Sequence, residues 1–460
     1  MPAVAYASAA EQPHLFDAVQ AENARRPGAS SALIDDKLRL STAGLETYFF
    51  SRWEPLLVDL MVVAAAVEYC DVSCRRPSHG WARSFDVRVA VHSPDHWQQD
   101  QVREALTDVL GFLTGDLWTF SFEQRRRVAE PVRQQSFELG TSARVIMPYS
   151  DGLDSRAVAA LIASEESDAL VRVRLGAKGA DLNVPSRRRY PFTVVPYEVR
   201  VPRADRRESS ARSRGFKFSV VTGVAAHLAN VDRIIVTESG QGVLGPVLTV
   251  SGHSHPDYRV HPAFSRRMER FFMALLGRSA RYEYPRLWST KGETLAAAAA
   301  LTSRFDWSDT RSCWQQSRQV SVDGRRRQCG ICAACLLRRM SLHRAGLIEV
   351  PGTYVCEDLS ASSLTASAIK GFSGFTNALH EYAIAGVLHL DHLASLAGSD
   401  LHARGKRRVA REVALAEGVD EISVEKALQG LLERHHKEWS AFLESLSVRS
   451  FIRQIASVKP

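Results

Sequence analysis

Apolar and polar positions follow two periods along this chain, and the two periods alternate. Strict alternation over residues 84–91 predicts a strand with one buried face, and a helix at 99–113 and a second strand at 117–122 follow it. Farther along, short apolar runs predict strands at 143–147, 171–175 and 233–237, separated by helices at 156–164 and 217–230. Repeated strand–helix–strand order is typical of a doubly wound parallel sheet, which binds ligands at the carboxyl ends of its strands. The sequence therefore predicts an α/β fold.

Changes in this pattern divide the chain into four regions. We expect an α+β domain at 1–140, which is a candidate for docking a partner, and an α/β domain at 141–305. A cysteine-bearing segment at 306–350 completes the core, and a helical region with a basic stretch occupies 351–460. At 460 residues the chain is long for one domain, so several are expected.

Composition indicates a cytoplasmic protein. The longest apolar stretch, at 56–67, is interrupted by Asp59 and is too short to cross a membrane, and the N-terminus lacks the pattern of a signal peptide. Much of the net charge of +8 lies in arginine runs at 187–189, 206–207 and 325–327. We interpret these runs as solvated loops, or otherwise as contacts to nucleotide phosphates. Nucleic-acid binding is less well supported, because no aromatic residues are interleaved with the basic ones.

The hexapeptide Ser150–Ser155 joins a predicted strand to a predicted helix. Backbone N–H groups and the positive end of the helix meet at such a turn, which suits an anion. Ser150 and Ser155 offer hydroxyl donors, Gly152 allows close approach of a phosphate, and Asp154 could hold Mg²⁺ or orient the loop. The alternative is an ordinary helix start with Asp154 or Ser155 as its N-cap. A Walker A loop is excluded, because no Gly-Lys-Ser/Thr follows.

Four of the seven cysteines have the spacing of a metal site: Cys313, Cys329, Cys332 and Cys335. Zinc binds four thiolates tetrahedrally, and such a closed site has a structural role. An iron–sulfur cluster is the main alternative, but a ferredoxin-type run continues with another cysteine and a proline, whereas Leu336 and Leu337 follow here. A further alternative is a set of free buried cysteines. The other three, Cys70, Cys74 and Cys356, are interpreted as thiols of the core.

The hexapeptide resembles the Ser-Gly-Gly-x-Asp-Ser loop of the PP-loop ATP pyrophosphatases, with Asp151 where that family has glycine. The resemblance implies that 141–305 is a PP-loop domain that cleaves ATP between its α and β phosphates and transfers AMP. It also implies that ATP is bound by the whole loop: Ser150, Asp151, Gly152, Leu153, Asp154 and Ser155.

Together, the loop and the cysteines resemble 7-cyano-7-deazaguanine synthases, the QueC family. Further similar segments are Thr290-Lys291-Gly292-Glu293, Thr310-Arg311-Ser312-Cys313, Ser213-Arg214-Gly215 and His255-Pro256-Asp257-Tyr258-Arg259. The family activates 7-carboxy-7-deazaguanine with ATP and transfers the acyl group to ammonia, which implies a catalytic Lys291 and an ATP-binding Arg214. Asp257, or secondarily Glu238, would accept N–H bonds from the base. Asp257 is alternatively a turn residue after Pro256, and Arg259 either neutralises an anion of the substrate or pairs with Asp257.

The long flanking regions resemble the QueC-like proteins of bacterial antiphage defence operons, such as QatC and the type IV CBASS member. That resemblance implies acyl transfer to the N-terminal amine of a partner protein from the same operon. Three alternatives stay open: a decorated 7-cyano-7-deazaguanine synthase, a PP-loop enzyme that modifies tRNA, and an inactive module that only binds a nucleotide or a partner.

Overall fold

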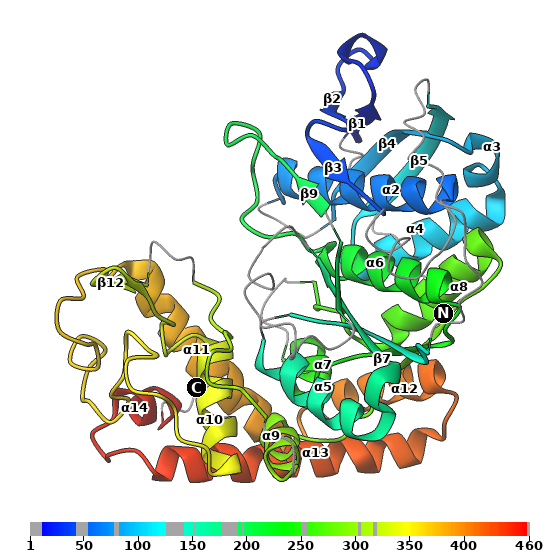
Figure 1. The fold of residues 1–460 in the computed structure, drawn as a ribbon. Helices are drawn as coiled ribbons and strands as arrows, with labels where there is room; N and C mark the ends of the chain where they lie inside the picture. The colour runs from blue at the N-terminus through cyan, green and yellow to red at the C-terminus, as the bar shows by residue number, and fades with distance from the viewer. Residues whose placement is uncertain are drawn as a thin grey trace. The chain divides into compact units, whose positions relative to one another are not determined.

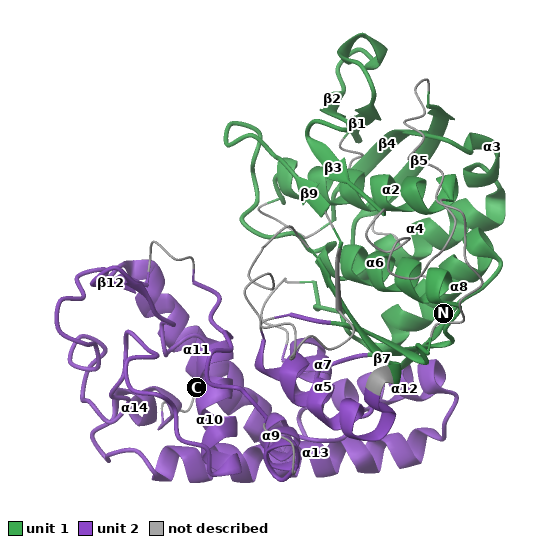
Figure 2. Ribbon diagram, in the orientation of Figure 1, with its two compact units in different colours: residues 1–148, 168–235, 250–283 green, residues 149–167, 236–249, 284–460 purple. Residues whose placement is uncertain are grey.

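The computed structural model describes residues 12–42, 54–77, 82–125, 142–150, 152–175, 192–195, 197–249, 255–301, 305–315 and 320–457. Asp151 and the arginine run at 187–189 lie outside these residues. The chain forms two compact units (Figure 2). Unit 1 contains residues 1–148, 168–235 and 250–283, and unit 2 contains residues 149–167, 236–249 and 284–460.

Unit 1 begins with a four-stranded parallel sheet of order β2-β1-β4-β5. Its strands are β1 (His14–Val19), β2 (Ser30–Leu33), β4 (Ser84–Val91) and β5 (Leu117–Gln124). The strand predicted at 84–91 is confirmed, and its alternate side chains are buried as the pattern required. Aromatic side chains of neighbouring strands cover that face, with the rings of Phe85 and Trp118 stacked at 4.3 Å.

The second sheet of unit 1 has five parallel strands in the order β11-β10-β6-β7-β8. They are β6 (Val145–Pro148), β7 (Leu170–Leu175), β8 (Phe192–Val195), β10 (Arg233–Ile235) and β11 (Arg281–Glu283). The order confirms the predicted doubly wound α/β fold. Strand order reverses between β6 and β10, and sheets of this kind bind ligands at the carboxyl ends of the strands at such a switch point.

Helices fill the space between the two sheets of unit 1 (Figure 1). Helices α2 (Pro55–Ser73) and α4 (Asp100–Thr114) contact the first sheet, and α6 (Arg214–Ala229) and α8 (Pro262–Leu276) contact the second. Helix α2 also packs on α6, and α4 packs on α8. This sandwiched position explains the apolar stretch at 56–67, because a helix buried on most sides is apolar on most sides. The short α3 (Pro94–Trp97) and an antiparallel pair, β3 (Leu38–Leu40) with β9 (Tyr197–Val199), complete the unit.

Unit 2 is mainly helical. It contains α5 (Leu153–Glu166), α7 (Gly240–Leu248), α9 (Lys291–Ala299), α10 (Ala333–Ala345), α11 (Asn377–Ser395), α12 (Ala403–Glu417), α13 (Glu421–Glu444), α14 (Phe451–Ser457) and the hairpin β12 (Ser321–Val322)–β13 (Arg325–Arg326). Helix α9 packs on α5 and α10, and the long α13 contacts α7, α10, α11 and α12. The predicted helical C-terminal region is confirmed, with its first helix beginning at Asn377. Among the described residues, no helix is long and apolar enough to span a membrane.

Candidate functional site

The loop after β6 is closed by its own serine hydroxyls. The chain leaves β6 at Pro148 and enters α5 at Leu153. The Ser150 hydroxyl accepts a hydrogen bond from the Gly152 N–H at 3.1 Å and lies 3.0 Å from the Ser155 hydroxyl. Gly152 is the N-cap, so Asp154 and Ser155 lie within the first turn of the helix, and no side chain of a described residue caps it. Side-chain capping by these two residues therefore does not explain the motif, and the N–H groups of the first turn can bind an anion.

Lys291 meets this loop through Asp154. Its ammonium group forms an ion pair with the Asp154 carboxylate, and both side chains are largely buried. Lys291 is the first residue of α9, where the helix dipole disfavours a cation. Asp154 lies in the first turn of α5, where the dipole favours a carboxylate. The ion pair thus holds the Lys291 ammonium group beside the phosphate-type loop, although the dipole of α9 disfavours a cation at this position.

The backbone around Lys291 is fixed by a capping box. The Thr290 hydroxyl accepts the Glu293 N–H at 3.0 Å, and the Glu293 carboxylate accepts the Thr290 N–H at 2.8 Å. This reciprocal pair is the physical reason for the Thr-Lys-x-Glu pattern. Gly292 is required by close packing, because a Cβ there would lie 2.6 Å from Cγ of Arg344.

Glu238 precedes α7 in the same unit. A Cβ on Gly242 would lie 2.5 Å from Oε2 of Glu238, so the glycine gives the carboxylate room beside the first turn of α7. A carboxylate is favoured at this end of a helix. Unit 2 therefore contains Ser150, Asp154, Ser155, Lys291 and Glu238.

Unit 1 contains the other three predicted binding residues: Arg214, Asp257 and Arg259. Asp257 accepts hydrogen bonds from Nε of Arg259 at 2.8 Å and from its backbone N–H at 3.2 Å. Both side chains are partly exposed, so the pair remains accessible to a ligand.

Arg214 begins α6 close to this pair. A Cβ on Gly215 would lie 2.8 Å from the backbone of Arg259, so the glycine permits the loop to approach the start of the helix. Burial lowers the pKa of Arg214, and the nearby charge of Arg259 lowers it further. Two clustered guanidinium groups of this kind favour binding of an anion.

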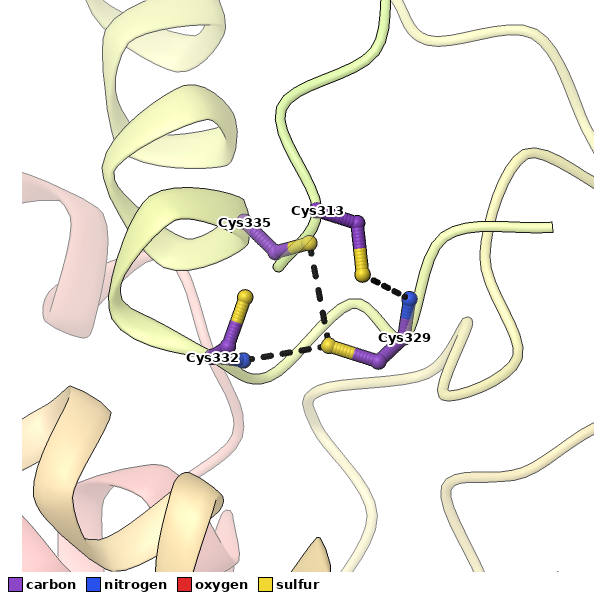
Figure 3. A group of neighbouring side chains, drawn as sticks. All are labelled: Cys313, Cys329, Cys332 and Cys335. Carbon is purple, nitrogen blue, oxygen red and sulfur yellow. Dashed lines mark hydrogen bonds between the residues drawn. The ribbon is translucent and has the colours of Figure 1, made fainter. Parts of the chain in front are cut away.

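The four predicted cysteines converge on one point (Figure 3). Their sulfur atoms all lie within 4.8 Å of one another, and those of Cys329 and Cys335 are 3.8 Å apart. A tetrahedron with Zn–S bonds of about 2.3 Å has edges of about 3.8 Å, so the donor set fits zinc. Cys332 is the N-cap residue of α10, Cys335 lies in the first turn of this helix, and Cys313 comes from a separate segment.

Hydrogen bonds and burial around the cysteines indicate a closed site. Sγ of Cys313 accepts the Cys329 N–H at 3.2 Å, and Sγ of Cys329 accepts the Cys332 N–H at 3.3 Å. Hydrogen bonds from the neighbouring thiols, Cys329 first, lower the pKa of Cys313. Gly330 has a positive φ of 86° and would clash through a Cβ with the backbone of Cys356. With three buried ligands and no position for substrate, the site would have a structural role.

Two residues that the sequence analysis did not assign hold the segment that carries Cys313. Oε1 of Gln328 accepts the backbone N–H groups of Ser312 at 2.8 Å and Cys313 at 3.2 Å. Arg338 is fully buried, donates to the Thr310 carbonyl at 3.2 Å, and pairs with Glu349 at 2.9 Å. The sequence contains one signal for this role of Arg338: it lies within the first two turns of a helix that starts at a predicted metal ligand.

Comparison with known proteins gives one match. The family described as "Queuosine biosynthesis protein QueC" matches residues 235–346. The matched segment runs from the end of β10 through Glu238 and Lys291 to the four cysteines and α10. No curated protein and no solved structure matches the chain.

Proposed function

We propose, from the QueC-family domain at residues 235–346, that this chain is an ATP-dependent enzyme that activates a carboxylate as an acyl-adenylate. The substrate would be 7-carboxy-7-deazaguanine, and the first step would release pyrophosphate. The observation that carries the proposal is the ion pair between Lys291, inside the matched segment, and Asp154, on the phosphate-type loop outside it.

The loop and Lys291 have complementary roles in this reaction. The oxygen of the substrate carboxylate attacks the α phosphorus, and the bond from the α phosphorus to the bridging oxygen of pyrophosphate breaks. N–H groups at the start of α5 and the Ser155 hydroxyl would stabilise the charge that develops on pyrophosphate. Lys291 would move from Asp154 to a phosphate oxygen, which leaves the Asp154 carboxylate available to Mg²⁺. The metal would supply further neutralisation of the phosphates.

Recognition of the base would use carboxylates. A deazaguanine presents N–H donors along its pairing edge, and a carboxylate accepts two of them in parallel. Asp257 and Glu238 are the candidates, and Arg259 or Arg214 would neutralise the carboxylate or phosphate of the substrate. The geometry that supports Asp257 is its double hydrogen bond to Arg259, which fixes the orientation of its carboxylate.

The acceptor we propose is the N-terminal amine of a partner protein. The QueC-like segment leaves large regions of the chain on both sides, which ammonia would not require. An amine attacks only when neutral, and an α-amino group with a pKa of about 7.7–8.0 is neutral far more often at pH 7 than a lysine at about 10.4. The amine nitrogen would bond to the acyl carbon, AMP would leave, and an amide would form.

The test supplies competing acceptors. Purified chain is incubated with ATP, 7-carboxy-7-deazaguanine and either ammonia or proteins encoded beside it, each with a free or an acetylated N-terminus. We expect the mass of one free-terminus protein to increase by the acyl group, while its acetylated form stays unchanged. Efficient formation of the nitrile from ammonia, with no protein modified, would instead identify a 7-cyano-7-deazaguanine synthase.

A further inference from the structure

We infer that helix α13 of the C-terminal region completes the site, with Arg434, His435 and Glu438 as positioning residues for Lys291. The inference rests on the proposed function, because Lys291 has its catalytic assignment there. Helix α13 (Glu421–Glu444) lies outside the matched segment at 235–346, so its role is a property of this chain rather than of the matched domain.

Two hydrogen bonds through Gln241 connect His435 of α13 to the backbone of Lys291, and a third hydrogen bond, to Leu390, holds the His435 ring. Nε2 of His435 lies 3.0 Å from the Leu390 carbonyl, which can only accept, so this nitrogen carries the proton. Nδ1 is then an acceptor, and the Gln241 amide donates to it at 2.8 Å. The amide oxygen of Gln241 in turn accepts the Lys291 N–H at 2.7 Å. The donor and the acceptor of each of these three hydrogen bonds are therefore determined.

Burial makes this arrangement rigid. His435 is fully buried, and Gln241 and Lys291 are nearly so. Burial also lowers the pKa of His435 to about 4, so the ring stays neutral at physiological pH and keeps an acceptor toward Gln241. If the His435 ring is replaced, the buried Gln241 amide loses its acceptor and no solvent can take its place. Gln241 also holds the backbone N–H of Lys291, so the position of Lys291 should change as well.

Two further side chains of α13 hold the capping box that contains Lys291. Oε1 of Glu438 accepts the Thr290 hydroxyl at 2.5 Å. Arg434 pairs with the Glu293 carboxylate at 3.0 Å and donates to the Trp288 carbonyl at 2.6 Å. Because residues 434 and 438 are four apart, they lie on the same face of the helix.

Packing places this face of α13 at the start of two helices. A Cβ on Gly240, the first residue of α7, would lie 2.6 Å from Leu431. A Cβ on Gly292 would lie 3.1 Å from Oε1 of Glu438. The glycines thus allow α13 to lie against the segments that carry Gln241 and Lys291.

Apolar packing holds α13 independently of these polar contacts. Leu428, Leu432, Trp439 and Phe442 are buried, and the Trp439 indole donates to Asp391 at 2.9 Å. Replacing the imidazole of His435 should therefore leave α13 docked. An effect of that replacement on Lys291 can then be distinguished from a general loss of stability.

The test compares His435→Phe, His435→Asn and His389→Phe in the full-length protein. Phenylalanine keeps the ring volume and removes the acceptor, whereas asparagine can place its oxygen near the position of Nδ1. His389 is the matched control, because it is a neighbouring histidine whose Nδ1 lies 3.0 Å from the Thr249 hydroxyl instead of Gln241. Turnover of ATP to AMP, KM for ATP, zinc content and thermal midpoint are measured for each.

We expect His435→Phe to lower kcat about five- to tenfold, as loss of one buried hydrogen bond would. We expect His435→Asn to recover most of that loss and His389→Phe to match the wild type. An unchanged kcat in His435→Phe would overturn the inference, as would equal losses in the two phenylalanine variants.

A second readout does not depend on turnover. The rate at which an amine-reactive reagent labels Lys291, followed by mass spectrometry, should rise in His435→Phe alone. If the wild type forms no AMP, the proposed function fails, and the labelling rates still decide whether α13 positions Lys291.

Discussion

Replacing Glu438 by glutamine should change how the stability of the protein depends on pH. The Glu438 side chain is buried against the start of α9, where its Oε1 accepts the Thr290 hydroxyl and its Oε2 has no hydrogen-bond partner among the described residues. Burial raises its pKa to about 7; the charge of Glu293 raises it too, and the Thr290 hydrogen bond, Arg344 and Arg434 oppose the shift. Glutamine keeps the acceptor for Thr290 and removes the ionisation.

The magnitude follows from linkage between protonation and folding. An unfolded glutamate has a pKa of about 4.3, so between roughly pH 4.3 and 7 the folded state holds a proton that the unfolded state has lost. The stabilisation from this proton is fully present below that range and is lost as the pH rises through 7. A difference of about 2.7 units corresponds to at most about 3.7 kcal/mol, of which about 2 kcal/mol falls between pH 5.5 and 8.

Urea unfolding at several pH values, with wild type and Glu438→Gln measured side by side, tests this reasoning. We expect the free energy of unfolding of the variant, relative to the wild type, to increase by about 2 kcal/mol from pH 5.5 to pH 8. Subtracting the two proteins removes the contributions of all other titrating groups. A constant difference would show that Glu438 is ionised in the folded protein throughout this range and would refute the assignment of a buried, protonated carboxyl.

Three further predictions concern the metal, the loop and the packing of α9. One zinc should bind per chain, and Cys332→Ser should give insoluble protein because the metal contributes to folding; iron with a visible charge-transfer band would contradict this. Asp154→Asn and Ser155→Ala should abolish formation of AMP and leave the fold intact by circular dichroism; retained turnover would exclude the loop as the phosphate site. Gly292→Ala should lower the free energy of unfolding by about 1–3 kcal/mol, because its Cβ would overlap Arg344; an unchanged urea midpoint would show that Arg344 moves aside.

Local sequence signals predicted the elements whose partners are close in the chain or whose chemistry is distinctive. The strand at 84–91 has a period set by one buried face, and the cysteine spacing is set by tetrahedral coordination. The sequence analysis noted Thr290–Glu293 only for its similarity to QueC proteins, and the structure shows that this segment is a capping box, which is complete within four residues. Each of these depends on contacts or geometry that a short segment specifies.

The contribution of α13 could not be predicted in the same way. His435 and Glu438 lie in a helix with many charged residues, where the sequence pattern indicates only a solvated face. Their partners Gln241 and Thr290 are 194 and 148 residues away in the chain. The order β2-β1-β4-β5 of the first sheet could not be predicted from the sequence either, because pairing between distant strands depends on tertiary packing.

The products formed from ATP test the central claim most directly. The chain is incubated with ATP and 7-carboxy-7-deazaguanine, and nucleotides and phosphates are separated, with Lys291→Met as the inactive control. We expect AMP and pyrophosphate in equal amounts, dependent on the deazaguanine and lost in the control, because an acyl-adenylate requires cleavage between the α and β phosphates. Formation of ADP and phosphate would contradict the account.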